Sequence, residues 1–319
     1  MQQKWFQRFS KFALVYTIAV ILFGAFVRAT GSGAGCGEHW PTCQGEIIPP
    51  APSIKTMIEF GHRLTSGLSL LVVVSLYFWS RQIFPKDHPA RKAALYSVIF
   101  IFGEALVGAV LVLMALVDQN SSPLRAAVIA AHLVNTFLLL YWQIFVVEAA
   151  SRADDFLQSS LSMNRNKSML RNLFYGLCGL GFVAASGGIV ALGDTLFPAT
   201  GLIDGFKTDL SPTAHFLIRL RIVHPIAAVA VAIFLVMQCL TILRLKFGKL
   251  PTIRALVLMY SLIGQLIFGT VNLLLLAPVW AQLIHLLIAD IIWITAVLLY
   301  LSLKFPEFSG AKDGSHGKA

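Results

Sequence analysis

Long apolar runs make up most of the chain, and short polar stretches separate them. Eight runs are candidates for membrane spans, at residues 12–28, 62–80, 93–116, 126–148, 172–192, 216–242, 255–277 and 279–303. A helix needs about 20 apolar residues to cross the hydrocarbon core of a bilayer. A helix also satisfies its own backbone hydrogen bonds, as lipid requires. The pattern therefore predicts an all-α membrane protein with eight transmembrane helices.

The second half of the chain repeats the first. IEFGHRLTSGLSLLV aligns with LRIVHPIAAVAVAIF, GEALVGAVLVL with GQLIFGTVNLL, and AAHLVNTFLLLYW with LIHLLIADIIWIT. The paired positions are His62 with His224, Gly103 with Gly264, Gly108 with Gly269, and His132 with His285. The alignment predicts two four-helix bundles, residues 1–150 and 151–319. Four spans per unit is an even number, so the pseudo-twofold axis should run along the membrane normal.

Four histidines lie inside these apolar segments: His62, His132, His224 and His285. An imidazole in hydrocarbon is costly, which makes each one a functional hypothesis. Each falls near the start of an even-numbered segment, so all four should share one leaflet, the outer one. The pairs predict an iron porphyrin between two facing helices in each half. The alternative is a histidine bonded to a backbone carbonyl of the next helix. Four others are expected to be exposed: His39, His88, His215 and His316.

The charge distribution indicates topology. The chain is 57% hydrophobic and 13% charged, whereas soluble domains carry about a quarter charged residues. Of the 25 Lys and Arg, 18 fall on the side of the N-terminus if all eight segments span. This bias predicts cytoplasmic termini in a bacterial plasma membrane, with the first segment kept as a helix. It also explains the net charge of +10 without a nucleic-acid partner.

Charged residues near the first histidine of each half differ between the halves. Glu59 precedes His62 by three residues and shares its helix face. It is interpreted as a base, a stabiliser of positive charge or a partner of a ligand, the alternative being a carboxylate at a helix N-terminus. Arg221 occupies the equivalent position in the second half. There it could pair with a porphyrin propionate, so the two sites are expected to differ in their roles.

Two further acids lie within predicted spans, Glu104 and Asp290. Buried acids in a membrane suggest a path for protons. Because Gln265 is the repeat equivalent of Glu104, a polar hydrogen bond between helices is the alternative, and the sequence favours neither. The repeated glycines are expected to permit close helix packing.

The loop at 29–58 is rich in Gly and Pro and carries Cys36 and Cys43. Because the loop is predicted on the oxidising side, a disulfide between them is favoured. The spacing is not a standard zinc or redox motif. The sequence leaves open whether the pair is structural or redox-active.

Several motifs resemble those of the heme A synthase family. They are GAFVRATGSGAGCGEHWPTC, then EFGHR, then a second histidine in the fourth segment, and the resemblance covers about residues 10–303. It implies an eight-helix protein of two four-helix bundles. Its activity would be oxidation of the C8 methyl of heme O to a formyl group, through an alcohol intermediate, to give heme A.

The resemblance also implies roles for particular residues. His62 and His132 would hold the substrate heme O, and Glu59 would be required for catalysis. His224 and His285 would hold a cofactor heme b. Cys36 and Cys43 match the family's cysteine pair. The implied partners are a heme O synthase, an electron acceptor and the lipid bilayer.

Two features depart from the family pattern. Residues 193–215 lack the second cysteine pair that some members carry, and Pro225 follows His224 where Arg63 follows His62. Two other functions stay open. A two-heme b-type membrane cytochrome that transfers electrons would also need four histidines, although hemes in one leaflet argue against it. A transporter with a parallel repeat would explain the duplication but not the histidines.

Overall fold

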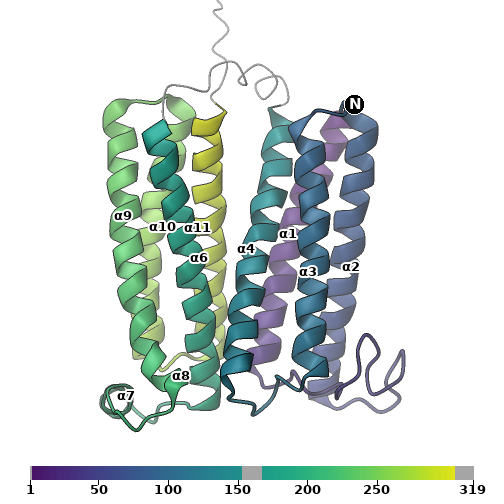
Figure 1. The fold of residues 1–319 in the computed structure, drawn as a ribbon, viewed down its shortest axis with the longest axis vertical. Coiled ribbons are helices and arrows are strands. Elements are labelled where there is room, and N and C mark those ends of the chain that lie inside the picture. The colour runs from purple at the N-terminus through teal and green to yellow at the C-terminus, as the bar shows by residue number, and fades with distance from the viewer. Residues whose placement is uncertain (1, 153–166, 306–319) are drawn as a thin grey trace, which may run out of the picture.

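The computed structural model describes residues 2–152 and 167–305. Long helices run side by side, and short helical elements lie at one end (Figure 1). The long helices are α1 (Gln2–Ala29), α2 (Ile54–Ile83), α3 (Pro89–Leu113), α4 (Pro123–Ser151), α6 (Lys167–Leu196), α9 (Val223–Leu245), α10 (Lys249–Leu274) and α11 (Val279–Lys304). The short elements are α7 (Leu202–Asp209), α8 (Phe216–Arg219) and the 3-10 turn η2 (Leu220–Ile222).

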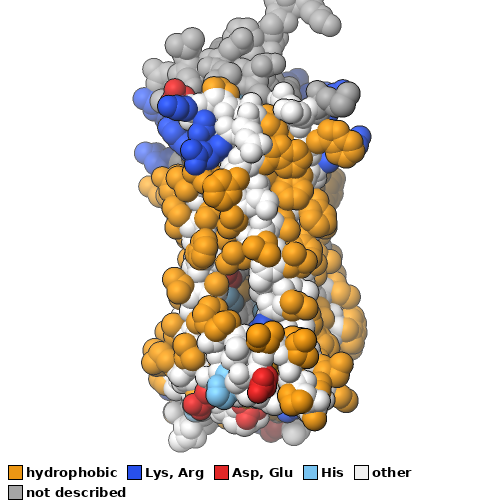
Figure 2. Space-filling model, turned by 90° about the vertical axis from the view of Figure 1, so that its right-hand side faces the viewer, with side chains coloured by type: hydrophobic (Ala, Val, Ile, Leu, Met, Phe, Trp, Pro, Cys, Tyr) orange, Lys and Arg blue, Asp and Glu red, His pale blue; other side chains and the backbone are white. Residues whose placement is uncertain are grey.

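Eight helices are long and apolar enough to cross a membrane, which confirms the prediction of a multi-pass membrane protein. Figure 2 shows a belt of hydrophobic side chains between an upper end rich in Lys and Arg and a lower end with acidic and histidine side chains. We call the lower end, which carries the Cys36–Cys43 loop, the disulfide end. The opposite end is the N-terminal end. The cytoplasmic placement of the termini stays a prediction.

The helices form two groups of four. In the first group α1 contacts α2, α2 contacts α3, α3 contacts α4, and α4 returns to α1. In the second group α6, α9, α10 and α11 close a ring in the same way. Figure 1 shows the two groups standing next to each other. The two-bundle architecture predicted from the repeat is confirmed, and the boundary at residue 150 stays a prediction.

The seam between the bundles is closely packed. Helices α1 and α4 of the first bundle contact α6 and α11 of the second. Phe137 on α4 stacks on Trp293 of α11, with ring centroids 4.7 Å apart. Gly188 on α6 faces Leu133 of α4 so closely that a Cβ at Gly188 would lie 2.2 Å from the Leu133 Cδ1 atom. This contact requires glycine and brings the two halves together.

Two of the histidine-bearing helices begin at serine caps. The Ser53 hydroxyl accepts a hydrogen bond from the Thr56 amide at the start of α2, at 3.2 Å. Ser122 accepts one from the Arg125 amide at the start of α4, also at 3.2 Å, and Pro123 follows it. A serine cap satisfies one of the free amides of a first turn, and proline is tolerated there. These caps fix how far along each helix the histidine lies.

The sixth predicted span, 216–242, differs from the expectation of one regular helix. It consists of α8, the 3-10 turn η2 and α9 in continuous succession. Pro225 lies in the first turn of α9 and has no amide hydrogen. It cannot donate to the carbonyl four residues earlier, so the backbone tightens just before it. His224 therefore sits directly after an irregular turn.

The expectation that His88 is exposed is wrong. Its side chain is only 1% exposed, and its ring stacks on Phe84 with centroids 4.2 Å apart. The Nδ1 atom accepts a hydrogen bond from the Ala90 amide and so caps α3. Burial lowers the pKa of the His88 imidazole, because the charged form loses its hydration. His316, also expected to be exposed, lies outside the described residues.

Candidate functional site

All four intramembrane histidines lie toward the disulfide end. Each stands within ten residues of the start of its membrane-spanning helix, and those four helices all start at that end. His62 is on α2 and His132 on α4, while His224 is on α9 and His285 on α11. The common depth predicted from the sequence is therefore confirmed, and each bundle contributes one pair.

His62 lies against the first helix of its bundle. A Cβ at Gly24 of α1 would be 3.0 Å from the His62 Cε1 atom and 3.2 Å from Nε2, so the glycine makes room for the ring. Phe23 meets the imidazole edge-on at 5.6 Å between centroids. The His62 Nδ1 atom is buried without a hydrogen-bond partner. A buried polar atom of this kind needs an explanation, and a bound ligand is one.

A carboxylate orients His132. The Nδ1 atom of His132 lies 3.1 Å from Oε2 of Glu104 on α3. Glu104 is itself held by the Asn135 amide at 2.5 Å and the Thr136 hydroxyl at 3.0 Å. Histidines that bind metals commonly direct their other nitrogen at a carboxylate, which fixes the ring and raises its basicity. The interhelical hydrogen bonds are confirmed for Glu104.

The second pair consists of two rings that face each other across a gap. The centroids of His224 and His285 are 6.4 Å apart, and their planes are inclined at 76°. Two imidazole nitrogens that share one metal at about 2 Å each place their ring centroids about 6 Å apart. The observed spacing has room for one metal atom between the rings.

His224 is oriented through the fifth membrane helix, α6. Its Nδ1 atom lies 3.1 Å from the Val183 carbonyl and 3.2 Å from the Ser186 hydroxyl. Donation from Nδ1 to the carbonyl leaves the lone pair of Nε2 free to bind a metal. Gly187 makes room for this ring as Gly24 does for His62, since a Cβ there would be 2.9 Å from Cε1.

His285 has an amide neighbour where His132 has a carboxylate. The Gln265 amide nitrogen lies 3.3 Å from the His285 Nε2 atom and donates to the His285 carbonyl at 3.0 Å. The Nδ1 atom is buried and unpartnered, and Gly269 approaches the ring at 3.0 Å from Cε1. The two histidine pairs thus share a plan but differ in the polar group that orients the second ligand.

The donor set fits an iron porphyrin better than a bare ion. Within the two described ranges, no group of three or more His, Cys, Asp or Glu side chains could hold a metal ion. Two imidazoles per bundle would be an incomplete set for a bare ion, but they suffice as axial ligands of a heme iron, whose other ligands come from the porphyrin. The glycines beside the rings and the unpartnered nitrogens are consistent with such a group.

Glu59 lies beneath the disulfide loop. Cys36 and Cys43 form the expected disulfide. The Cys36 amide donates to Oε2 of Glu59 at 2.8 Å, and Arg63 donates to Oε1 at 2.5 Å and 3.2 Å. Arg63 also holds the loop carbonyls of His39 and Thr42. The Glu59 side chain is therefore a buried, ion-paired carboxylate that connects the loop to α2.

Arg221 is already bound by protein groups. Its Nε atom lies 2.9 Å from the Asp194 carboxylate, and Nη1 lies 3.4 Å from that of Asp209. Nη2 donates to the carbonyls of Gly193 and Phe197. Burial raises the pKa of the Asp209 carboxyl, although the Arg221 charge opposes this rise. The propionate contact expected of Arg221 would have to compete with two carboxylates.

Asp290 and the remaining repeat glycines take no shared part in these sites. Asp290 on α11 is fully buried, and neither of its carboxyl oxygens has a hydrogen-bond partner within residues 2–152 and 167–305. Gly103 packs against Asn135, as expected for close helix contact. A Cβ at Gly108 or Gly264 would meet nothing within 4 Å.

The sequence reasoning missed the glycines of the first helix of each half. Gly24 and Gly187 contact equivalent histidines, and they are 163 residues apart, close to the offset of the histidines. Laying GAFV on GGIV would have found them, but the rest of those segments align poorly. Arg28 was also missed, because its contacts join segments that are distant in the sequence.

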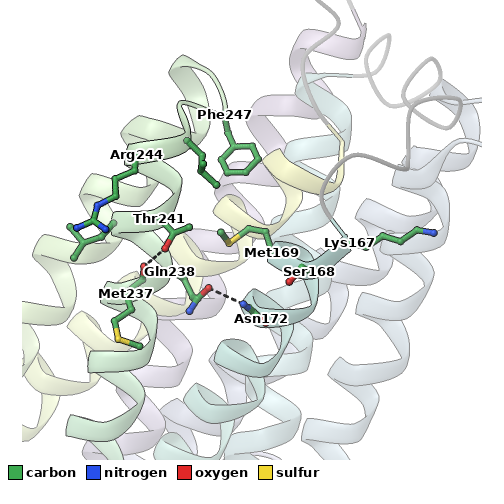
Figure 3. Close-up of a pocket in the computed structure, with 11 residues that line it drawn as sticks. Lys167, Ser168, Met169, Asn172, Met237, Gln238, Thr241, Arg244 and Phe247 are labelled. Carbon is green, nitrogen blue, oxygen red and sulfur yellow. Dashed lines mark hydrogen bonds between the residues drawn. The ribbon is translucent and has the colours of Figure 1, made fainter.

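A groove at the N-terminal end lies apart from the histidines. It measures about 700 Å³ and runs between α6 and α9 (Figure 3). Asn172 donates to Gln238 across it, and Lys167 and Arg244 line it. The lining contains no histidine, so it supplies no imidazole ligand for a heme iron.

Comparison with known proteins gives consistent matches. The family model described as cytochrome oxidase assembly protein, COX15-CtaA, matches residues 7–297. A heme A synthase of Exiguobacterium sibiricum is 30% identical over 238 residues, which are 75% of each chain. A heme A synthase of Bacillus mycoides is 41% identical over 107 residues, 32% of this chain and 34% of that protein.

A longer relative also matches. A protein of Thermus thermophilus named protoheme IX farnesyltransferase is 44% identical over 289 residues. The match covers 91% of this chain but 47% of that protein. The chain therefore spans about half the length of this relative.

Proposed function

The chain belongs to the heme A synthase family of cytochrome oxidase assembly proteins, and on that premise we propose that it oxidises the C8 methyl group of heme O to a formyl group. The product is heme A, and the alcohol is the intermediate. One observation carries the proposal. Each bundle brings two imidazoles to the same depth, and imidazole is a common axial ligand of heme iron.

The conversion removes electrons from the porphyrin methyl group. With water as the oxygen source, the methyl and one water give the aldehyde, four protons and four electrons. The first two electrons and two protons leave when the alcohol forms, and the rest leave when the aldehyde forms. The acceptor class that we propose is a redox carrier of the membrane.

The first bundle is proposed as the substrate site. His62 and His132 would hold the iron of heme O, and Glu104 keeps the His132 ring in place through its contact of 3.1 Å. Glu59 would accept a proton or stabilise positive charge that develops at the methyl carbon. Its ion pair with Arg63 favours the charged carboxylate that this role requires.

The second bundle is proposed as the cofactor site. His224 and His285 would hold a heme b, which supplies a one-electron relay between the first bundle and the acceptor. The Val183 carbonyl and the Ser186 hydroxyl fix the orientation of the His224 ring. The close seam between the bundles supports electron transfer from one site to the other.

The name of the Thermus relative supports a link to substrate supply. That protein is about twice as long as its match to this chain and is named for farnesyl transfer to protoheme IX. Its other half is a candidate for making the farnesylated heme. We propose a heme O synthase as the partner of this chain, in a bacterial plasma membrane with both termini cytoplasmic.

The test is co-expression with a heme O synthase in a host that makes no heme A. Hemes are then extracted and identified by mass. We expect heme A or the alcohol to appear only when the chain is present. Protein that carries heme b while heme O stays unchanged, although an electron acceptor is supplied, would overturn the proposal and favour the two-heme cytochrome.

Glu59→Gln tests the proposed base in the same host. We expect porphyrin content close to that of the unchanged protein and a loss of heme A of about a hundredfold or more, because general acid–base groups contribute about that much. Glu38→Gln, an exposed change in the same loop region, is the matched control. Full activity of Glu59→Gln would exclude the catalytic role.

A further inference from the structure

Arg28 crosses the seam between the two bundles. It lies in the last turn of α1, and its Nη1 atom donates to the Ala191 carbonyl at 2.6 Å and the Thr195 hydroxyl at 2.9 Å, both on α6. Its Nη2 atom donates to the Gln282 amide oxygen of α11 at 3.0 Å. All three acceptors are neutral.

No carboxylate of the described residues lies within ion-pair distance of Arg28. Asp194 is near enough for its charge to act on Arg28, but its carboxylate is paired with Arg221 at 2.9 Å. A cation that is largely removed from water is costly unless a negative charge compensates it. Arg28 therefore lacks the counter-ion that its surroundings call for.

Arg125 is a second cation in the same position. It lies in the first turn of α4, is only 6% exposed, and donates from Nη1 to the carbonyls of Asp118 and Asn120 at 2.7 Å each. Its Nε atom is buried without a partner. The Asp118 carboxylate acts on it electrostatically, but that side chain is outside ion-pair distance.

The two arginines act on each other. The charge of Arg125 is among those that Arg28 experiences, so two like charges share one region of the seam. The start of α4 adds the positive end of a helix dipole there. Repulsion of this kind is offset only by an anion, and the described part of the chain places no carboxylate within ion-pair distance of either arginine.

The location connects these cations to the histidine pairs. Gly24, which contacts His62, is one helical turn before Arg28, and His132 lies two turns along α4 from Arg125. Gln282, which binds Arg28, precedes His285 by three residues. The end of α1 and the start of α4 lie at the disulfide end (Figure 1).

We propose that Arg28 and Arg125 form a binding site for the carboxylates of a porphyrin, its propionate side chains, at the seam between the bundles. The proposal rests on the proposed function only in that the chain binds a porphyrin. It replaces Arg221, whose guanidinium already has two carboxylate partners. A guanidinium with free donors is well suited to a carboxylate.

The test compares two porphyrins that differ only in these carboxylates. Iron protoporphyrin IX and its dimethyl ester are titrated into the full chain, purified in detergent from a heme-deficient host. Affinities are measured for the unchanged protein, Arg28→Gln and Arg125→Gln. Arg219→Gln, an exposed arginine at the same end, is the matched control.

We expect the unchanged protein and Arg219→Gln to prefer the free acid to the same degree. Arg28→Gln and Arg125→Gln should each lose about tenfold or more of affinity for the free acid, the range of a charged hydrogen bond, and little for the ester. Equal losses for both porphyrins would indicate a structural role and overturn the proposal. An undiminished preference for the free acid in both variants would also overturn it.

Two further arms separate the remaining outcomes. If Arg28→Gln does not fold, Arg28→Lys keeps the charge and should keep the preference. Exchanging phosphatidylcholine for phosphatidylglycerol in the micelles tests a lipid headgroup as the anion. Lipid binding that needs Arg28, without any porphyrin preference, would overturn the assignment. Heme A formation without a free-acid preference would refute this inference alone, whereas absence of any porphyrin binding would refute the proposed function.

Discussion

One atom group distinguishes the second ligand of each bundle. Glu104 presents a carboxylate to His132 at 3.1 Å, and Gln265 presents an amide to His285 at 3.3 Å from equivalent positions. A carboxylate makes the imidazole a stronger donor to a metal, and a neutral amide does so less. The first bundle is thus built to stabilise a more oxidised iron than the second.

Exchanging these two residues tests their effect. Glu104→Gln should lower porphyrin retention in the first bundle or heme A formation about tenfold to hundredfold, as found for groups that orient metal ligands. Heme content and the midpoint potential are the measurements. Gln265→Glu is the matched change in the second bundle and should lower the potential of that heme. Unchanged retention, activity and potential in both variants would contradict the assignment.

Residues near the first site also show how a charge is kept in an apolar region. Glu59 has Arg63 and a backbone amide as partners, so its negative charge is neutralised within the protein. Because the same Arg63 binds two carbonyls of the disulfide loop, the loop and the carboxylate are positioned together.

At the scale of helices, each bundle places a glycine of its first helix against the first histidine. Gly24 on α1 and Gly187 on α6 leave 3.0 Å and 2.9 Å for a Cβ beside the Cε1 atoms of His62 and His224. Helices α1 and α2, and likewise α6 and α9, pack directly on each other. The helix packing therefore sets the position of each ring.

Gly24→Ala and Gly187→Ala should each displace one histidine ring. The added methyl group is too close to the ring, which must move by a few tenths of an ångström. We expect each change to lower heme retention in its own bundle several-fold, measured as heme bound per protein. Gly181→Ala adds a methyl into open space on α6 and should be neutral or slightly stabilising, since alanine favours helix by about 1 kcal/mol over glycine. Full retention in both ring-facing variants would refute this account.

At the scale of the whole molecule, an ion pair joins the bundles toward the N-terminal end. Glu148 of α4 is buried, and Arg254 of α10 binds both of its carboxylate oxygens at 2.8 Å. Arg254 also donates to the Leu298 carbonyl of α11. Together with the Arg28 contacts at the disulfide end, this pair holds the seam at two distant heights.

Glu148→Gln should destabilise the chain markedly. The change leaves the Arg254 charge in a largely buried position without its carboxylate, which costs about 3 kcal/mol. The midpoint of thermal unfolding in detergent is the measurement, and we expect it to fall by several degrees. Glu46→Gln removes an exposed carboxylate and should leave the midpoint unchanged. Equal midpoints for the two variants would show that the ion pair does not hold the bundles together.

The sequence by itself determined the eight spans, the duplication and the common depth of the four histidines. Apolar length and repeat spacing are local properties of the chain, and the bilayer turns them directly into helices. The Cys36–Cys43 disulfide was also within reach, because the two cysteines are neighbours in one short loop.

Only the tertiary structure decided which groups orient the histidines and where the positive charges without a carboxylate partner lie. The partners of Arg28 include Gln282, 254 residues away, and those of His224 lie on another helix. Sequence spacing carries no information on such contacts, because they depend on how two helices rotate against each other. For the same reason the charge of Arg221 suggested a propionate contact, while folding brought two carboxylates to it and left Arg28 and Arg125 without one among the described residues.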